Sequence, residues 1–158
     1  MKGEDMATPS DNSRESIPKE KAANIKKGLL TWKKDTVFTA NIRGHAIHFD
    51  AGGNEGCTPT ESLLMSLPGC MAVDIVLFLR KMQAEIGKFD IETTGEANPS
   101  PPKYFRAIHM KINIAGKGIT PEKLERAISL SQKKYCSVRH SLREDMDITI
   151  SYDIAENA

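Results

Sequence analysis

The chain has 158 residues and a mass of 17.5 kDa, which suits one domain and leaves little room for two. Lysine and arginine total 22, and aspartate and glutamate total 21. This near-balance argues against a general nucleic-acid binder, which usually carries a strong basic excess. No run of eighteen apolar residues occurs and we find no secretory signal, so we expect a cytoplasmic protein without a membrane segment. The three cysteines are then expected to be reduced thiols rather than a disulfide scaffold.

Residues 1–27 differ in composition from the rest of the chain. They hold eleven charged residues and no aromatic one. A segment this polar buries too little apolar surface to offset the entropy of ordering it. We therefore predict a disordered polar tail over 1–27 and one folded domain over 28–158.

Two strands are predicted at the start of the domain. Residues 36–43 alternate apolar and polar side chains, and residues 45–50 form the return strand after a turn at Gly44. The apolar face that we expect to point inward consists of Phe38, Ala40, Ile42, Ile47 and Phe49.

A long helix is predicted after the glycine-rich loop. Thr58 is a good N-cap, Pro59 fits the first helical position, and Glu61 completes a capping box. From Pro59 to about Ile86 the sequence is apolar nearly all round, which is typical of a buried helix. Such a helix would be about 40 Å long. Because this exceeds the interior of a small domain, we expect the helix to run through a homodimer.

The second half of the chain alternates strands with helices. Strands are predicted over 90–97, 105–115 and 146–154, and helices over 120–135 and 138–144. Hairpins and helices that come in blocks indicate an α+β fold rather than a doubly wound parallel sheet.

Cys70 is the first candidate for chemistry. It follows Pro68 and Gly69 inside the apolar helix, and we expect the proline to kink or restart the helix there. A restart would leave free backbone N–H groups beside the sulfur, an environment that favours the nucleophilic thiolate. A buried cysteine is also often only a small core side chain. Cys70 alone does not decide between these interpretations.

Cys136 is the second candidate. Residues 135–138 mark the junction between two predicted helices, which places the cysteine at a helix N-terminus, where thiols are activated. Arg139 and His140 follow closely and would add positive charge. If the helices pack together, Cys70 and Cys136 can meet as an attacking thiol and a resolving thiol.

The other candidate residues are weaker. Cys57 lies in a glycine-rich loop and is expected to be an incidental surface thiol. Glu61 has its capping role or, alternatively, orients a guanidinium near Cys70. Cys136 and His140 are four residues apart, a spacing that zinc sites use, but no C-x-x-C pair or H-E-x-x-H helix supports a metal site. We therefore expect no metal and no organic cofactor.

Two motifs resemble those of a known family. Residues 58–70, TPTESLLMSLPGC, resemble the N-P-E-E-L…C helix of the OsmC-like family, which includes osmotically inducible protein C and the organic hydroperoxide resistance proteins. Residues 135–138, YCSV, resemble the second, C-P-V cysteine motif of that family. The spacing of the cysteines and the order of elements also match, and the resemblance covers about residues 30–154.

The resemblance implies an α+β fold in which two subunits intertwine and sheets from both chains enclose two long central helices. It also implies a thiol-dependent peroxidase that acts on organic hydroperoxides or hydrogen peroxide and is recycled by a thiol reductant. By motif match, Cys70 is the peroxidatic cysteine and Cys136 the resolving one. Glu61 matches the glutamate that pairs, in the family, with an arginine beside the reactive thiol.

That arginine is where this sequence departs from the family. The family's peroxidases carry it shortly before the first helix, whereas residues 48–55 contain none. Arg43 is the nearest upstream candidate, and Arg139 and His140 are the others. Ser137 stands where the family usually has proline. A redox-sensing or small-molecule-binding protein with the same fold and little turnover is therefore the alternative to a peroxidase.

Overall fold

The computed structural model describes residues 24–155, so the tail predicted over 1–27 lies almost entirely outside the described residues. The strands are β1 (Leu29–Lys34), β2 (Val37–Ile42), β3 (His45–Asp50), β4 (Glu85–Ala97), β5 (Phe105–Lys117) and β6 (Asp147–Ala155). The helical segments are α2 (Pro59–Lys81), α3 (Pro121–Leu130), the π-helical turn η1 (Ser131–Tyr135) and α4 (Ser137–Ser141).

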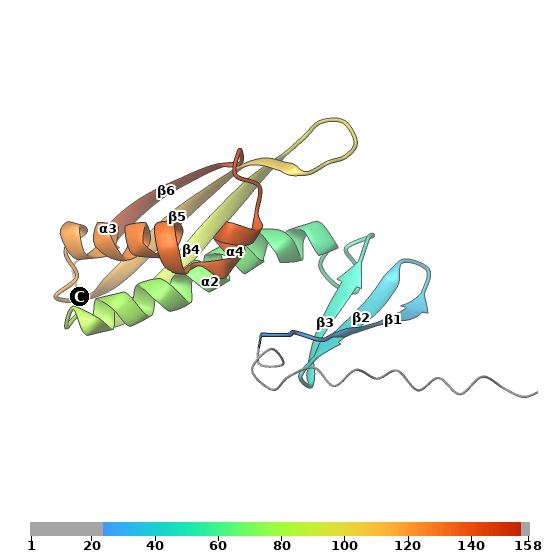
Figure 1. The fold of residues 1–158 in the computed structure, drawn as a ribbon, viewed down its shortest axis with the longest axis horizontal. Coiled ribbons are helices and arrows are strands. Elements are labelled where there is room, and N and C mark those ends of the chain that lie inside the picture. The colour runs from blue at the N-terminus through green and yellow to red at the C-terminus, as the bar shows by residue number, and fades with distance from the viewer. Residues whose placement is uncertain (1–23, 156–158) are drawn as a thin grey trace, which may run out of the picture.

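These elements form two three-stranded sheets and a layer of helices (Figure 1). The first sheet is antiparallel, in the order β1-β2-β3. In the second sheet, β4 pairs with β5 antiparallel and β5 pairs with β6 parallel. The predicted α+β class is confirmed. The sequence-based prediction missed β1, whose residues LLTWKK show too little alternation to mark a strand.

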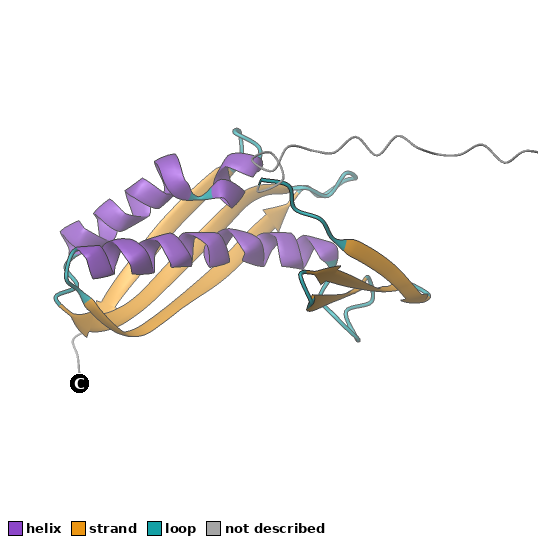
Figure 2. Ribbon diagram, turned by 60° about the horizontal axis from the view of Figure 1, so that its bottom comes forward, coloured by secondary structure: helices purple, strands orange, loops and turns teal. Residues whose placement is uncertain are grey.

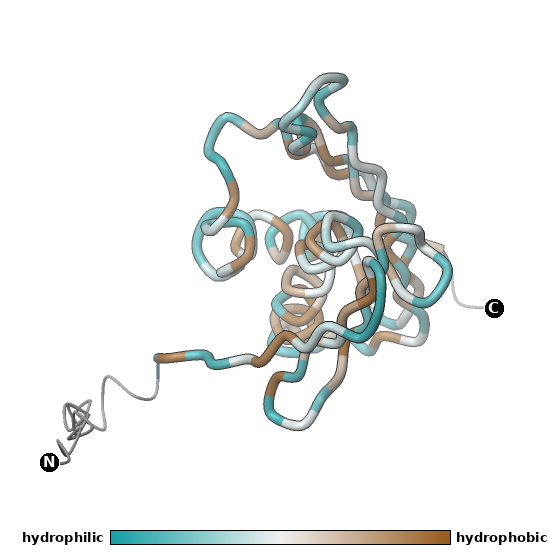
Figure 3. Tube along the Cα trace, turned by 90° about the vertical axis from the view of Figure 1, so that its right-hand side faces the viewer, coloured by the Kyte–Doolittle hydropathy of each residue, from teal (hydrophilic) through white to brown (hydrophobic). Residues whose placement is uncertain are grey.

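The core of the domain lies between the helices and the second sheet. Helices α2 and α3 lie side by side against one face of that sheet in both ribbon views (Figure 2). Apolar stretches recur along both sheets and the helices (Figure 3). The side chains at the centre of the core are Leu67, Met71, Ile75, Leu79, Ile108, Met110, Ile112 and Leu124. Burying each such side chain contributes about 1.5–3 kcal/mol, so this layer dominates the stability of the subunit.

Helix α2 begins as predicted but ends earlier. The Thr58 hydroxyl accepts the Glu61 N–H over 3.3 Å, and the Thr58 N–H donates to the Glu61 carboxylate over 2.7 Å. The predicted end near Ile86 is wrong, because Gln83 adopts a left-handed conformation with φ of 60°. The Ala84 N–H then bonds to the Leu79 carbonyl over 3.0 Å, which closes a Schellman motif. Such caps usually carry glycine, so a glutamine at this position does not indicate a helix end.

The first sheet stands beyond the N-terminal end of α2 and apart from the main core (Figure 1). Its predicted apolar face exists, since Phe38 pairs with Phe49 and Ala40 pairs with Ile47. The expectation that this face points inward is wrong for the single subunit, where Ile47 is 40% exposed. On the opposite face, only Val37, Thr39 and Asp50 are buried, at the end of the sheet next to the loop that follows β3.

Asp50 organises that loop. Its carboxylate accepts backbone N–H groups from Gly52, Asn54 and Glu55 over 2.9–3.2 Å, and these bonds hold the pKa of Asp50 below its usual value. A hydroxyl from Thr36 adds a further bond of 3.1 Å. The loop therefore delivers the chain from β3 to the cap of α2 in one fixed conformation.

Large apolar side chains remain exposed on the outer face of α2. They are Leu63, Met65, Val73 and Leu77, each between 46% and 60% exposed. By length and composition alone α2 would pass for a membrane span, and 28% of the tested stretch is buried. The other flank of the same helix forms the centre of the core, as in the core helices of soluble proteins. One subunit thus leaves part of its longest helix uncovered.

Candidate functional site

One face of α2 contacts the segment that leads from η1 into α4. Cys70, Asp74 and Phe78 are spaced four residues apart, so they share one face of the helix. We call these three residues the α2 stripe. The pairs across this contact are Cys70 with Cys136, Asp74 with Ser131, and Phe78 with Tyr135.

The structure therefore brings the two predicted thiols together. Cys136 is completely buried at the junction of η1 and α4, and Cys70 is partly buried on α2. Burial is the main reason why the pKa of Cys136 rises to about 11, and hydrogen bonding to the neighbouring Cys70 raises it further. At neutral pH, Cys136 is consequently a protonated thiol in contact with Cys70.

Backbone groups fix the position of Cys136 on two sides. Its sulfur is the N-cap of α4 and accepts the Arg139 N–H over 3.3 Å. Its own N–H donates to the Ser131 carbonyl over 2.9 Å. The N–H groups of Arg139 and Val138 lower the pKa of Cys136, but burial outweighs them. Cys136 thus lies at the N-terminus of α4, as predicted, but its pKa is raised rather than lowered.

The environment expected for Cys70 is also wrong in one respect. Helix α2 runs unbroken from Pro59 to Lys81 with Pro68 inside it, so no new helix N-terminus forms beside the sulfur. Proline lacks an N–H, which leaves the Leu64 carbonyl, an acceptor, without its helical donor. The helix therefore supplies no free N–H groups to Cys70 at this point.

The predicted cations do not surround Cys70 in one subunit. Arg43 lies in the turn between β2 and β3 with φ of 53°, on the sheet that stands apart. Arg139 contacts the site through its backbone N–H, while its guanidinium donates to the Arg143 carbonyl over 3.5 Å. His140 is exposed. Among residues 24–155, no ion pair joins any of the three to Glu61.

Glu61 is occupied by its capping role. Its carboxylate accepts the N–H and the hydroxyl of Thr58 over 2.7 and 2.9 Å. Both bonds lower the pKa of Glu61, and the bond from the backbone N–H has the larger effect. Cys57 is exposed as predicted, with its sulfur 3.8 Å from the His48 carbonyl. In the described part of the chain, no group of three or more histidine, cysteine or acidic side chains is placed to hold a metal ion.

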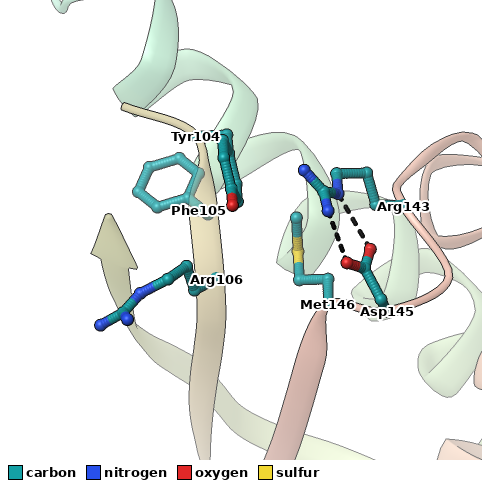
Figure 4. Close-up of a pocket in the computed structure, with 6 residues that line it drawn as sticks. All are labelled: Tyr104, Phe105, Arg106, Arg143, Asp145 and Met146. Carbon is teal, nitrogen blue, oxygen red and sulfur yellow. Dashed lines mark hydrogen bonds and ion pairs between the residues drawn. The ribbon is translucent and has the colours of Figure 1, made fainter. Parts of the chain in front are cut away.

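A cavity of about 210 Å³ lies where the β4–β5 hairpin meets the start of β6 (Figure 4). The Arg143 guanidinium lies 4.3 Å from the centre of the Tyr104 ring and forms an ion pair with Asp145. Its positive charge is therefore already balanced. Neither Cys70 nor Cys136 lines this cavity.

Asp74 and Ser131 are the site residues that sequence reasoning missed. The Ser131 hydroxyl donates to the Asp74 carboxylate over 2.7 Å, and Ser131 is completely buried. A signal was present in the sequence, since Asp74 is the only charged residue between Glu61 and Arg80. A charge in so apolar a helix needs a hydrogen-bonding partner, and that requirement points to a specific contact.

An α+β fold with two thiols held between a long helix and the cap of a short one defines a class, and comparisons identify it. The family model for OsmC-like protein matches residues 52–151, so the chain belongs to the OsmC-like family. Protein YhfA of Escherichia coli K12 is 32% identical over 127 residues, which cover 79% of this chain and 95% of YhfA.

Solved structures share the fold. A hypothetical protein from Aquifex aeolicus VF5 is 27% identical with a TM-score of 0.79, and the match covers 85% of this chain and 99% of that one. The organic hydroperoxide resistance protein OhrB of Bacillus subtilis is 13% identical with a TM-score of 0.58, over 83% and 99% of the two chains. At that identity the likeness to OhrB concerns the fold alone.

Proposed function

We propose that this protein is a cytoplasmic thiol-dependent peroxidase that reduces organic hydroperoxides or hydrogen peroxide. The observation that carries the proposal is the contact between Cys70 and Cys136 in a fold shared with a protein named for organic hydroperoxide resistance. Two thiols in contact are what a disulfide-forming cycle requires, and the thiols themselves supply the chemistry without a metal or organic cofactor.

Differences between the two cysteines support the roles that we propose for them. Cys136 is completely buried and its pKa is about 11, so it is a poor first nucleophile at neutral pH. Cys70 is less buried and lies on the helix that carries Glu61. Cys70 is therefore the peroxidatic cysteine and Cys136 the resolving one.

The cycle then has three balanced steps. The Cys70 thiolate attacks the terminal oxygen of the hydroperoxide, an S–O bond forms as the O–O bond breaks, and the released alkoxide takes a proton from water to become the alcohol. The Cys136 thiolate attacks the resulting sulfenic acid, the S–S bond forms, and the hydroxide leaves as water after taking a proton. A dithiol reductant finally reduces the disulfide by exchange and is itself oxidised.

A homodimer completes the proposed site. The exposed apolar face of the first sheet and the exposed face of α2 are complementary in character, and a second copy of the chain would bury both. The largest exposed side chain on that sheet is Trp32, at 62%. In such a dimer Arg43, which is remote from Cys70 in its own subunit, would stabilise the Cys70 thiolate of the partner, with Glu61 holding the guanidinium.

The alternative is a redox-sensing or small-molecule-binding protein with little turnover. One observation favours it: within residues 24–155 of the single subunit, Glu61 bonds only to Thr58 and has no arginine partner. A thiolate without a nearby cation reacts slowly.

Hydroperoxide consumption in the presence of dithiothreitol separates these two functions. We expect catalytic consumption of cumene hydroperoxide by the wild type and its loss in Cys70→Ser. The matched control is Cys57→Ser, which should retain the wild-type rate. A wild type that consumes no more hydroperoxide than Cys70→Ser would favour the binding protein.

A further inference from the structure

We propose that Asp74 is a positioning residue for the resolving thiol. Through Ser131, it fixes the backbone that carries Cys136 at the separation from Cys70 at which the two sulfurs can bond. This inference rests on the proposed function, because it concerns the step in which Cys136 attacks oxidised Cys70. Asp74 exchanges no proton and contacts no substrate in this role.

A short series of hydrogen bonds connects Asp74 to Cys136. The Asp74 carboxylate accepts the Ser131 hydroxyl over 2.7 Å, and the Ser131 carbonyl accepts the Cys136 N–H over 2.9 Å. Two bonds therefore connect α2 to the backbone of the buried cysteine. Since Ser131 is completely buried, water does not compete for the two hydrogen bonds that Ser131 makes.

The starting point of this series of bonds is informative. Asp74 lies one helical turn after Cys70 on the same helix, so the anchor of the second thiol and the first thiol belong to one rigid element. A movement of η1 away from Asp74 would move Cys136 away from Cys70. The edge-to-face contact of Phe78 with Tyr135, at 5.1 Å between ring centres, holds the other end of η1 to the same stripe.

The segment that Asp74 holds has an unusual backbone. Ser131–Tyr135 forms a π-helical turn directly after α3, and Cys136 follows it in an extended conformation with ψ of 99°. Single π turns are rare and often occur at functional sites, because they reorient the residues that follow. Here the turn redirects the chain so that Cys136 faces α2 rather than continuing α3.

Positioning matters because disulfide geometry is narrow. The Cα atoms of bonded cysteines usually lie about 4.4–6.8 Å apart. When the Cys136 thiolate attacks the sulfenic sulfur, the S–S bond forms as the S–O bond breaks and the oxygen leaves as water. A loosened η1 would leave the first step, at Cys70, intact and would slow this second step.

The test measures the two steps separately in the full-length protein. One equivalent of cumene hydroperoxide is mixed with the reduced protein. Samples are quenched at intervals, the sulfenic acid is trapped with dimedone, and the mass of the intact protein is measured by mass spectrometry. Ser131→Ala and Asp74→Ala should slow disulfide closure about tenfold or more, because small misplacements cost large factors in rate. The rate at which Cys70 is first oxidised should stay within about twofold of the wild type.

Two further variants make the result specific. Asp74→Asn keeps a carbonyl oxygen that can accept the Ser131 hydroxyl, so it should recover most of the closure rate. Ser141→Ala removes an exposed hydroxyl that donates to the Ser137 carbonyl over 2.8 Å and takes no part in the bonds between Asp74 and Cys136. This variant should form the disulfide at the wild-type rate. Wild-type closure in Ser131→Ala, or an equal slowing of both steps, would overturn the positioning role.

A second oxidant keeps this inference separate from the proposed peroxidase. Oxidised glutathione forms the same Cys70–Cys136 disulfide by exchange and needs no peroxidase activity. Suppose that hydroperoxide does not oxidise the protein, but that oxidised glutathione forms the disulfide about tenfold faster in the wild type than in Ser131→Ala. The proposed peroxidase activity is then wrong, and the positioning role of Asp74 stands. If hydroperoxide works and all variants close alike, the positioning role is wrong. A wild type that forms no disulfide with either oxidant overturns both.

Discussion

The sulfur of Cys136 caps helix α4 by accepting the backbone N–H of Arg139 over 3.3 Å. Helix N-caps are usually serine, threonine, aspartate or asparagine, whose oxygens accept such bonds more strongly. Here the cap is the proposed resolving thiol, and its sulfur is bound and buried before any oxidant arrives. The cost of burying the charged thiolate leads to the first prediction.

Disulfide closure should accelerate with pH. The thiolate is the nucleophile, and burial raises the pKa of Cys136 to about 11, so only a small fraction is ionised at neutral pH. Because the pKa is raised, that fraction grows as pH rises, and the closure rate should increase about tenfold per pH unit until pH approaches about 11. Rapid-quench measurements between about pH 7 and about pH 9 check this. A closure rate that does not change over this range would contradict the assignment of Cys136 as a buried thiol.

The subunit should form a homodimer through the exposed face of its first sheet. Trp32→Glu places a charge on that face and should shift the protein to monomers at micromolar concentration, as seen by light scattering. The matched control is Thr31→Glu, because Thr31 is exposed and precedes Trp32 in the regular part of the strand, so it points to the opposite face. Thr31→Glu should remain dimeric. A wild type that is monomeric at micromolar concentration would contradict the proposed dimer.

Arg43 should promote the reactivity of Cys70 only from the partner subunit. Arg43→Ala should slow alkylation of Cys70 by iodoacetamide at neutral pH about tenfold, the effect of about 1.4 kcal/mol of lost charge stabilisation. Lys88→Ala, which removes an exposed charge from β4, serves as the control. Unchanged kinetics in Arg43→Ala would remove Arg43 from the site. Loss of rate in Arg139→Ala or His140→Ala would then identify the cation.

Gly116 should be essential for the stability of the second sheet. A β-carbon at this position would lie 2.0 Å from the Glu85 carbonyl oxygen. The backbones of Gly116 and Glu85 belong to paired strands, so neither can move away at low cost. We expect Gly116→Ala to lower the free energy of unfolding by about 1–3 kcal/mol. Gly87→Ala lies at the same bulge but meets the Ala115 carbonyl only at 3.5 Å, so it should change stability by less than about 0.5 kcal/mol. Urea unfolding at one protein concentration measures both, and equal midpoints would contradict this steric explanation.

The sequence predicted the elements of the main domain well, because their signals are local. The box of Thr58 and Glu61 marks the start of α2, and alternating isoleucines mark β5. The end of α2 was missed because Gln83 adopts a left-handed backbone conformation, which its residue type does not predict. The inward face of the first sheet was misassigned because alternation identifies an apolar face without identifying what covers it.

The candidate site was only partly predictable for a similar reason. The family motifs identified Cys70 and Cys136, and the fold brings them together. The prediction that Pro68 restarts the helix was wrong, because α2 continues through this proline without ending. The lone charge of Asp74 indicates that a hydrogen-bonding partner exists, but Ser131 lies 57 residues away and no local pattern identifies it as that partner.

The most direct test of the account is the mass of the protein after reaction with one equivalent of cumene hydroperoxide. The account predicts that each subunit loses two hydrogens and that proteolytic mapping finds a disulfide between Cys70 and Cys136, while Cys57 remains free for alkylation. The Cys136→Ser variant should instead stop at a sulfenic acid on Cys70 that dimedone traps. Oxidation that falls on Cys57, or a wild type whose Cys70 and Cys136 stay reduced, would contradict the account.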